Sequence, residues 1–140
     1  MTKTVIATTN APGAIGPYSQ AIKVNGFIFV SGQIGLAPTT GELVDGGVEE
    51  QSRQALTNVK NVLAAAGSNL GKVVKTTVFL KDINDFAALN AVYGEFFGAD
   101  CPARSAVQVA ALPKNALVEI EVIAEAGKSL GKRRGYDERF

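Results

Sequence analysis

Hydrophobic and polar positions recur along the chain with two different periods, and the period changes where Gly or Pro residues occur. Strict alternation indicates a strand with one face toward a core, and recurrence at every third and fourth position indicates an amphipathic helix. The clearest strand signal is "AIKVNGFIFVSG", in which Asn25 and Gly26 separate two β-rich runs. This dipeptide is typical of a type I′ turn, whose two central residues both have positive φ. The pattern therefore predicts a β-hairpin near the N-terminus.

Two segments show helical spacing. Small and apolar residues recur at this spacing over about 48–66, and Gly67 follows where a left-handed residue would end the helix. A second apolar stripe runs through 84–98 and ends at Gly98. The stretch "VVKTTVFLK" at 73–81 lies between them and reads as a strand. These segments predict a helix, a strand and a second helix in that order.

Two further apolar segments, 104–109 and 117–125, flank "LPKN", and this spacing predicts a closing hairpin. The predicted order is ββαβαββ, with a short additional strand at 3–7. Two helices between strands of one sheet favour an α+β fold with a single layer of two helices on a mixed sheet. Strands such as "FIFV" carry apolar residues on both faces, so the face without helices needs a partner. A homo-oligomer with packed sheets is the simplest solution.

Length and charge limit the domain organisation and the partners. A chain of 140 residues is expected to form one domain that can bury a core without disulfide or metal. Residues 1–126 carry nine Lys and Arg against eleven Asp and Glu, a net charge of −2. Residues 127–140 carry five against two, a net charge of +3, and are expected to form a flexible basic tail. A domain at −2 is a poor partner for nucleic acid, which is bound by clustered cations.

Missing residue types exclude several kinds of site. The chain contains no His, which removes Ser-His and Cys-His nucleophiles and His-based metal sites. Cys101 is the only cysteine, so no internal disulfide forms, which fits a reducing compartment. No run of eighteen apolar residues and no apolar leader-like segment occurs. We therefore expect a cytoplasmic protein without a membrane span or a metal site.

Charged residues interrupt the two apolar segments of the predicted closing hairpin. Along 118–122, apolar residues alternate with Glu119 and Glu121. If the apolar faces match across the hairpin, Arg104 lies on the same side as both glutamates. Charges that are half-buried at an interface are costly unless they are paired or functional. Two interpretations stay open: a salt bridge that fixes the register of subunits, or an anion site with a nearby water-activating glutamate.

Five stretches of the chain, in order, match the pattern of one known family. They are "APGAIGPYSQA", "FIFVSGQI", "NVKNVLAAAG", "VVKTTVFLKDINDFAALNAVY" and "PARSAVQVAALPKNALVEIEVIA". Together they resemble the YjgF-like reactive-intermediate deaminases, or Rid family, over nearly all of residues 5–126. The resemblance implies a chorismate-mutase-like trimer with a central β-barrel and ligand clefts between subunits. It also implies cofactor-independent hydrolysis of 2-imino acids, such as 2-iminobutanoate and 2-iminopropanoate, to 2-keto acids and ammonia.

The resemblance assigns catalytic roles to three residues. The carboxylate-binding arginine of the family falls on Arg104, its water-positioning glutamate on Glu119 and its pocket tyrosine on Tyr18. Arg104 would then hold the carboxylate of a small 2-imino acid against one water. Glu119 would orient that water and take its proton, while Tyr18 would close the pocket.

Four further positions match substrate-binding residues of the family. They are Ser31 and Gly32 in "SGQ", Asn90 in "FAALNAVY" and Ala106 in "PARSA". Family members often read "PARSC" at the last of these. The resemblance implies that this residue acts through its backbone carbonyl, which Ala106 retains, whereas the thiol is absent. Cys101, three residues before the arginine, does not take over the role of that thiol.

Two other functions stay open. The family has also been described as translation inhibitors with ribonuclease activity. The absent His, the net charge of −2 over 1–126 and the lack of an aromatic and basic face argue against this function. A non-catalytic protein that binds small carboxylates, or a chaperone-like protein, would keep Arg104 but would not depend on Glu119.

Overall fold

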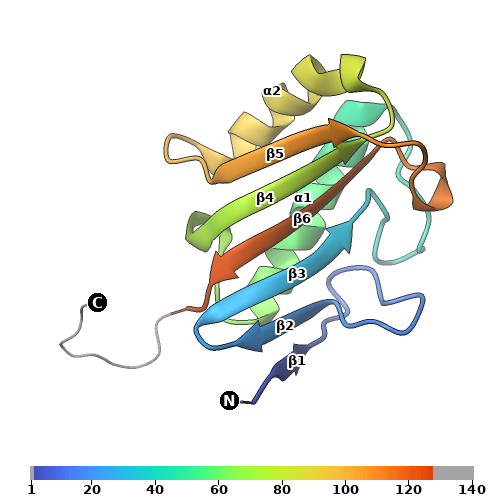
Figure 1. The fold of residues 1–140 in the computed structure, drawn as a ribbon. Helices are drawn as coiled ribbons and strands as arrows, with labels where there is room; N and C mark the ends of the chain where they lie inside the picture. The colour runs from blue at the N-terminus through green and yellow to red at the C-terminus, as the bar shows by residue number, and fades with distance from the viewer. Residues whose placement is uncertain (1, 128–140) are drawn as a thin grey trace.

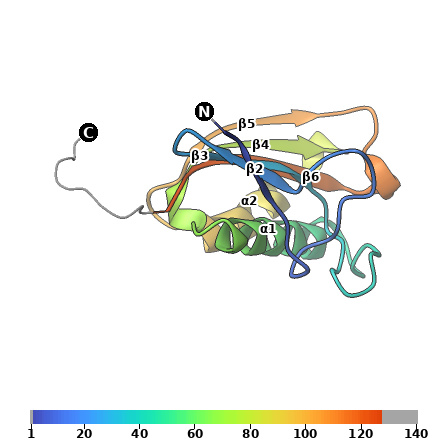
Figure 2. The ribbon, with the colours of Figure 1, turned by 90° about the horizontal axis from the view of Figure 1, so that it is seen from below.

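Two helices cover one face of a six-stranded sheet in the computed structural model, which describes residues 2–127 (Figure 1). The strands are β1 (Thr4–Ile6), β2 (Ala21–Val24), β3 (Phe27–Gln33), β4 (Val73–Leu80), β5 (Ala103–Gln108) and β6 (Val118–Glu125). The helices are α1 (Val48–Ala65) and α2 (Phe86–Phe97), with short 3-10 segments at Leu70–Lys72, Ile83–Asp85 and Pro113–Asn115. Both long helices lie on the same side of the sheet (Figure 2). The predicted α+β fold with one layer of two helices is confirmed.

The other side of the sheet, which we call the open face, is not covered by any helix of the described residues (Figure 2). None of the helices in residues 2–127 is both long and apolar enough to cross a membrane. The basic tail predicted at 127–140 lies, from residue 128 onward, outside the part of the chain that the structure describes.

The N-terminal hairpin is formed by β2 and β3, with Val24 paired to Phe27 across the turn. Asn25 has φ 51° and Gly26 has φ 84°, so both central residues adopt the left-handed conformation that the type I′ turn requires. Along β3, Ile28 is fully buried under the helices, while the residue before it is exposed on the open face. The alternation predicted from the sequence therefore determines which side of this strand faces the core.

Helix α1 supplies much of the core and also holds the loops beside the sheet. Its fully buried apolar residues are Ala55, Leu56, Val59, Val62 and Leu63. Two polar side chains on the same helix bond to loop backbone. The Gln51 side chain accepts a hydrogen bond from the N–H of Leu117 at 2.8 Å, and the Asn58 side chain donates to the carbonyl of Leu36 at 2.9 Å. The helix therefore fixes the segments that lead into β6 and out of β3.

The predicted hairpin between 104–109 and 117–125 is wrong, although both strands exist. The sheet order is β1-β2-β3-β6-β4-β5, so β4 lies between β5 and β6. β5 runs parallel to β4, and β6 pairs antiparallel with both β3 and β4. The connection from β4 through α2 to β5 is a helical crossover, the usual way to join parallel neighbours. The loop after β5 then passes across the end of β4 to reach the centre of the sheet.

This strand order separates the charges that were expected to share one side. Arg104 is opposite Thr76, and Thr76 is opposite Val122 on β6. Residues opposite one another point to the same face of a sheet, so Arg104 lies on the helix-covered face with the buried Val122. Side chains alternate between the two faces along a strand. Glu119 and Glu121 lie three positions and one position before Val122 on β6, so they point to the open face. Within one chain, the prediction that Arg104 lies on the same side of the sheet as Glu119 and Glu121 is therefore wrong.

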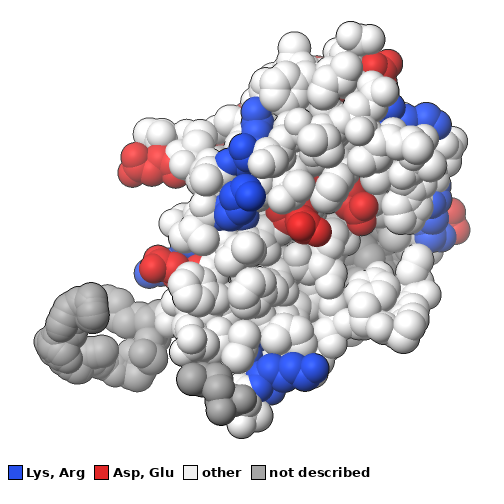
Figure 3. Space-filling view, in the orientation of Figure 1, with Lys and Arg blue, Asp and Glu red and all other residues white. Residues whose placement is uncertain are grey.

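Large apolar side chains are exposed on the open face. They are Val5 on β1, Phe27 and Phe29 on β3, and Val107 on β5. Figure 3 shows this face from the front: much of it is uncharged, with acidic side chains near its middle and basic side chains beside them. The structure thus leaves uncovered the face for which the sequence predicted a partner.

Ser52 on α1 gives a test of the core. It is fully buried, and its hydroxyl has no hydrogen-bond partner within the described residues. We expect Ser52→Ala to increase the free energy of unfolding by about 1 kcal/mol, because the variant no longer buries an unsatisfied polar group. Urea denaturation at one fixed protein concentration measures this difference.

Ser68→Ala is the matched control for that substitution. The Ser68 hydroxyl is also buried, but it donates to the carbonyl of Glu125 at 2.8 Å. Removing it should lower the free energy of unfolding by about 1 kcal/mol, opposite in sign to Ser52→Ala. Equal losses of stability in both variants would contradict this account of the core.

Candidate active site

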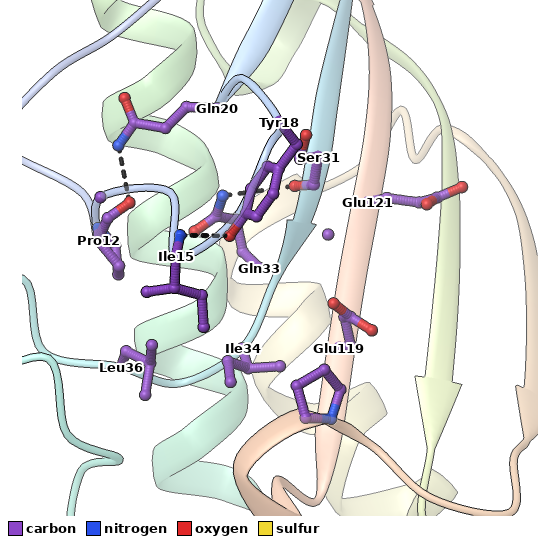
Figure 4. A pocket seen from close by; sticks show the side chains of 13 residues that line it. Pro12, Ile15, Tyr18, Gln20, Ser31, Gln33, Ile34, Leu36, Glu119 and Glu121 are labelled. Carbon is purple, nitrogen blue, oxygen red and sulfur yellow. Dashed lines mark hydrogen bonds between the residues drawn. The ribbon is translucent and has the colours of Figure 1, made fainter.

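A cavity of about 410 Å³ opens between the loop before β2, the end of β3 and the start of β6. Its volume falls within the range common for small-molecule sites. Four of the residues predicted from the sequence line it together: Tyr18, Ser31, Gly32 and Glu119. Figure 4 labels Tyr18, Ser31 and Glu119. The four residues come from three segments of the chain, the loop before β2, β3 and β6, and the fold brings them to one place.

The loop that carries Tyr18 is tied to β3 by backbone and side-chain hydrogen bonds. The hydroxyl of Ser31 donates to the carbonyl of Ser19 at 2.6 Å, and its backbone N–H donates to the carbonyl of Gln20 at 3.0 Å. The Tyr18 hydroxyl accepts from the N–H of Ile15 at 3.4 Å, which curls the loop over the cavity (Figure 4). Ser31 therefore has a structural role in holding this wall as well as a place in the lining.

Gln20 anchors the rest of the loop. Its side chain is buried, accepts from the N–H of Thr8 at 2.7 Å and donates to the carbonyl of Pro12 at 2.7 Å. Because these bonds link residues eight and twelve positions away, they fix the loop in a closed curve above the cavity. We did not predict Gln20 as a site residue, although it lies in the stretch "GPYSQA" beside Tyr18.

Gly32 makes room for the Glu119 carboxylate. A Cβ atom at Gly32 would lie 2.5 Å from Oε2 of Glu119 and 3.0 Å from its Cγ. The β3–β6 register shifts between Val30 and Gln33, so the glycine sits at an irregularity of the strand pair. Any larger residue at position 32 would displace Glu119 from the cavity wall.

The environment of Glu119 favours its neutral form. Burial raises the pKa of its carboxyl group, and the like charge of Glu121, two residues along the strand, raises the pKa further. Both carboxylates line the cavity, and no Lys or Arg of the described residues does so. A half-buried carboxylate with a raised pKa is suited to take a proton from water and return it later.

Three predicted site residues lie elsewhere. Arg104 and Ala106 lie on the helix-covered side of β5, the outermost strand, and Asn90 lies on α2 above them. Nη1 of Arg104 donates to Oδ1 of Asn90 at 2.9 Å. None of the three lines the cavity. The structure thus forms two groups, one around Glu119 and one around Arg104, on opposite faces of the sheet.

Sequence reasoning missed the apolar wall of the cavity. Ile15, Ile34, Leu36 and Pro113 line it together with the two carboxylates. Figure 4 labels the first three of these apolar residues. The sequence marks Pro113 only as part of the "LPKN" segment between two predicted strands. No local pattern marks these residues, because loops far apart in the sequence meet there only once the sheet has formed. Among the described residues, no group of three or more His, Cys, Asp and Glu could hold a metal ion.

Known proteins share this architecture and much of this sequence. Residues 8–126 match the family model described as endoribonuclease L-PSP. Human 2-iminobutanoate/2-iminopropanoate deaminase is 55% identical over 88% of this chain and 90% of its own. The Rid family protein YyfA of Yersinia pestis is 54% identical, with a TM-score of 0.87 over 89% of this chain and 100% of its own.

A further solved structure, E. coli TdcF with bound serine, is 48% identical, with a TM-score of 0.84 over 89% of this chain and 99% of its own. The family model covers most of the chain, and the identities lie far above the level at which only the fold is shared. The chain therefore belongs to the endoribonuclease L-PSP family, which contains the YjgF-like or Rid proteins.

Proposed function

We propose that this protein is a cofactor-independent imine deaminase that hydrolyses small 2-imino acids, such as 2-iminobutanoate and 2-iminopropanoate, to 2-keto acids and ammonia. The observation that carries the proposal is the convergence of Tyr18, Ser31, Gly32 and Glu119 on one cavity. It occurs in a chain 55% identical to a human protein named for this reaction. The bound serine of TdcF, also a small carboxylate, supports a substrate of this size.

Glu119 supplies the proton transfers in this proposal. As the oxygen of a water bonds to C2 of the protonated imine, Glu119 takes a proton from that water, and the C=N electrons move to nitrogen. Glu119 then returns the proton to the nitrogen of the carbinolamine. The C–N bond breaks, the hydroxyl oxygen forms the C=O bond, and its proton leaves with the ammonia as ammonium. One acid–base group is enough because it acts in both steps.

The cavity of one chain lacks an anchor for the substrate carboxylate. Its charged lining residues are Glu119 and Glu121, which repel an anion. Arg104 is the residue suited to bind a carboxylate, but it lies on the other face of the sheet. We infer that Arg104 and Asn90, with the backbone carbonyl of Ala106, face the cavity of a second copy. Ser31 and Gly32 would contact the substrate on the side where Glu119 holds the attacking water.

A homotrimer accounts for both separated groups. The open face exposes Val5, Phe27, Phe29 and Val107, and burying such side chains contributes about 25 cal/mol per Å² of apolar surface. Packing the open faces of three copies around a central barrel would bury this surface and bring the β5 edge of one copy near the cavity of the next. Each trimer would then contain three equivalent sites. A cytoplasmic location stays a prediction from the sequence.

The description of the family model names a second activity, that of an endoribonuclease. The part of the cavity that one chain lines holds two carboxylates and, within the described residues, no Lys or Arg. Even with one Arg104 from a second copy, this site lacks the clustered cations that bind a phosphate backbone. A non-catalytic carboxylate-binding or chaperone-like protein would need the Arg104 group alone. Substitutions at Glu119 separate this last function from that of an enzyme.

Glu119→Gln should lower kcat/KM by about 100-fold or more, since it removes the proton acceptor while keeping the shape of the side chain. Arg104→Ala should lower kcat/KM by a similar factor of about 100, because the substrate carboxylate loses a charged partner. The rates are measured by generating the imine with a threonine dehydratase and trapping what remains with semicarbazide. Glu125→Gln, on the exposed end of the same strand, is the matched control and should retain wild-type rates. Full activity in Glu119→Gln would leave only a binding function.

The acid limb of the pH profile tests the charge environment of Glu119. Its pKa is raised by burial and by Glu121, so kcat/KM should begin to fall at a pH above the ordinary range of a glutamate. Glu121→Gln removes the like charge but not the burial. The limb should therefore move to lower pH without reaching the range of an exposed glutamate. A limb that stays in place or moves to higher pH would show that Glu121 does not act on the catalytic carboxylate.

Mixed oligomers test whether one site uses two copies. Trimers of Arg104→Ala alone and of Glu119→Gln alone contain no complete site. A mixture refolded at equal amounts should recover about a quarter of wild-type activity, since half of the copies supply Arg104 and half supply Glu119 at random. Recovery requires exchange of subunits, which mass spectrometry of differently labelled variants verifies. Exchanged but inactive mixtures would place both residues in the site of a single copy.

A further inference from the structure

The guanidinium of Arg104 is held by three side chains of α2. Its Cζ lies 4.7 Å from the ring centroid of Tyr93 and 5.0 Å from that of Phe86, and Nη1 donates to Asn90 at 2.9 Å. Aromatic faces attract a cation at these distances. A guanidinium has five N–H donors, and within the described residues one of its hydrogen bonds is made, to Asn90. The other donors are available to a ligand carboxylate.

The Tyr93 ring is itself fixed by a buried hydrogen bond. Its hydroxyl lies 2.7 Å from Oγ1 of Thr76, and both residues are buried. Burial raises the pKa of the Tyr93 hydroxyl, so it stays protonated at neutral pH and the bond persists. The ring also contacts Phe97, with centroids 4.6 Å apart. Thr76 is directly opposite Arg104 in the β4–β5 pair, so one strand pair determines the positions of both the cation and the ring beneath it.

We propose that Thr76 and Tyr93 are positioning residues of the carboxylate anchor. Their hydroxyl–hydroxyl bond sets the plane of the Tyr93 ring, and that plane sets the direction in which Arg104 presents its free N–H groups. The inference rests on the proposed function, in which Arg104 binds the carboxylate of a 2-imino acid. It adds two buried residues that touch neither the substrate nor the cavity around Glu119.

If Thr76 and Tyr93 contributed only to stability, their substitution would have a different effect on substrate binding. Val and Phe would fill nearly the same space as Thr76 and Tyr93 without burying two hydroxyls between a helix and a sheet. If packing were all that mattered, Thr76→Val combined with Tyr93→Phe would leave substrate binding unchanged. If the hydroxyl pair orients the ring, the double variant folds normally but binds carboxylates less well.

The test compares Thr76→Val, Tyr93→Phe and the double variant with wild type. We expect KM to rise about three- to tenfold in all three, the effect of one lost hydrogen bond, with kcat changed by less than about twofold. The inhibition constant of propanoate should rise by the same factor as KM. That of propanamide, which has no charge for Arg104 to bind, should stay within about twofold of wild type. The double variant should unfold at nearly the wild-type temperature.

Two controls separate the possible failures. Ser68→Ala removes a buried hydroxyl that bonds to Glu125 instead, so it should lower the unfolding temperature and leave KM unchanged. Arg104→Ala is assayed in parallel. Wild-type KM in the three test variants, with Arg104→Ala inactive, would overturn the positioning role and leave the proposed function standing. Full activity in Arg104→Ala would overturn the proposed function itself.

Discussion

The position of β4 between β5 and β6 is the constraint on which the account of this protein depends. Because β4 pairs with both neighbours in register, Arg104 on β5 and Glu119 on β6 point to opposite faces of one sheet. No rotation of a side chain brings the two groups together across a packed sheet. A reaction that needs both of them must therefore use more than one copy of the chain. The apolar open face supplies a reason for copies to associate.

Each face of the sheet holds one charged side chain in a defined environment. On the open face, Gly32 allows the Glu119 carboxylate to lie against the backbone of β3, where burial and Glu121 disfavour its charge. On the helix-covered face, aromatic rings and Asn90 hold the guanidinium of Arg104 in place. A carboxylate that takes up protons readily and a cation with a fixed direction are what hydrolysis of a small anionic imine requires.

Local features of the fold could be predicted from the sequence. Asn25 and Gly26 require positive φ, and the apolar spacing before Gly67 defines a helix, so the hairpin and α1 followed from short-range rules. The pairing of β5 and β6 could not be predicted in this way. Strands adjacent in sequence often pair, but here a helical crossover fixes β5 beside β4, and only the complete sheet determines that order.

The candidate site also contains features that could be predicted from the sequence and features that depend on the complete sheet. Tyr18, Ser31, Gly32 and Glu119 were found through the stretches that resemble a known family, and the fold brings them to one cavity. The face on which Arg104 lies was predicted wrongly, because it depended on the mistaken hairpin. The apolar wall and the Thr76–Tyr93 bond had no signal in the sequence, since each joins segments that meet only in the folded chain.

The most direct measurement is a crystal structure of the assembled protein with the product 2-oxobutanoate bound. We expect two N–H groups of Arg104 from one copy to hold the product carboxylate, with C2 beside the carboxylate of Glu119 from the neighbouring copy. A product molecule bound next to Glu119 with its carboxylate away from every Arg104 would show that the two groups do not form one site.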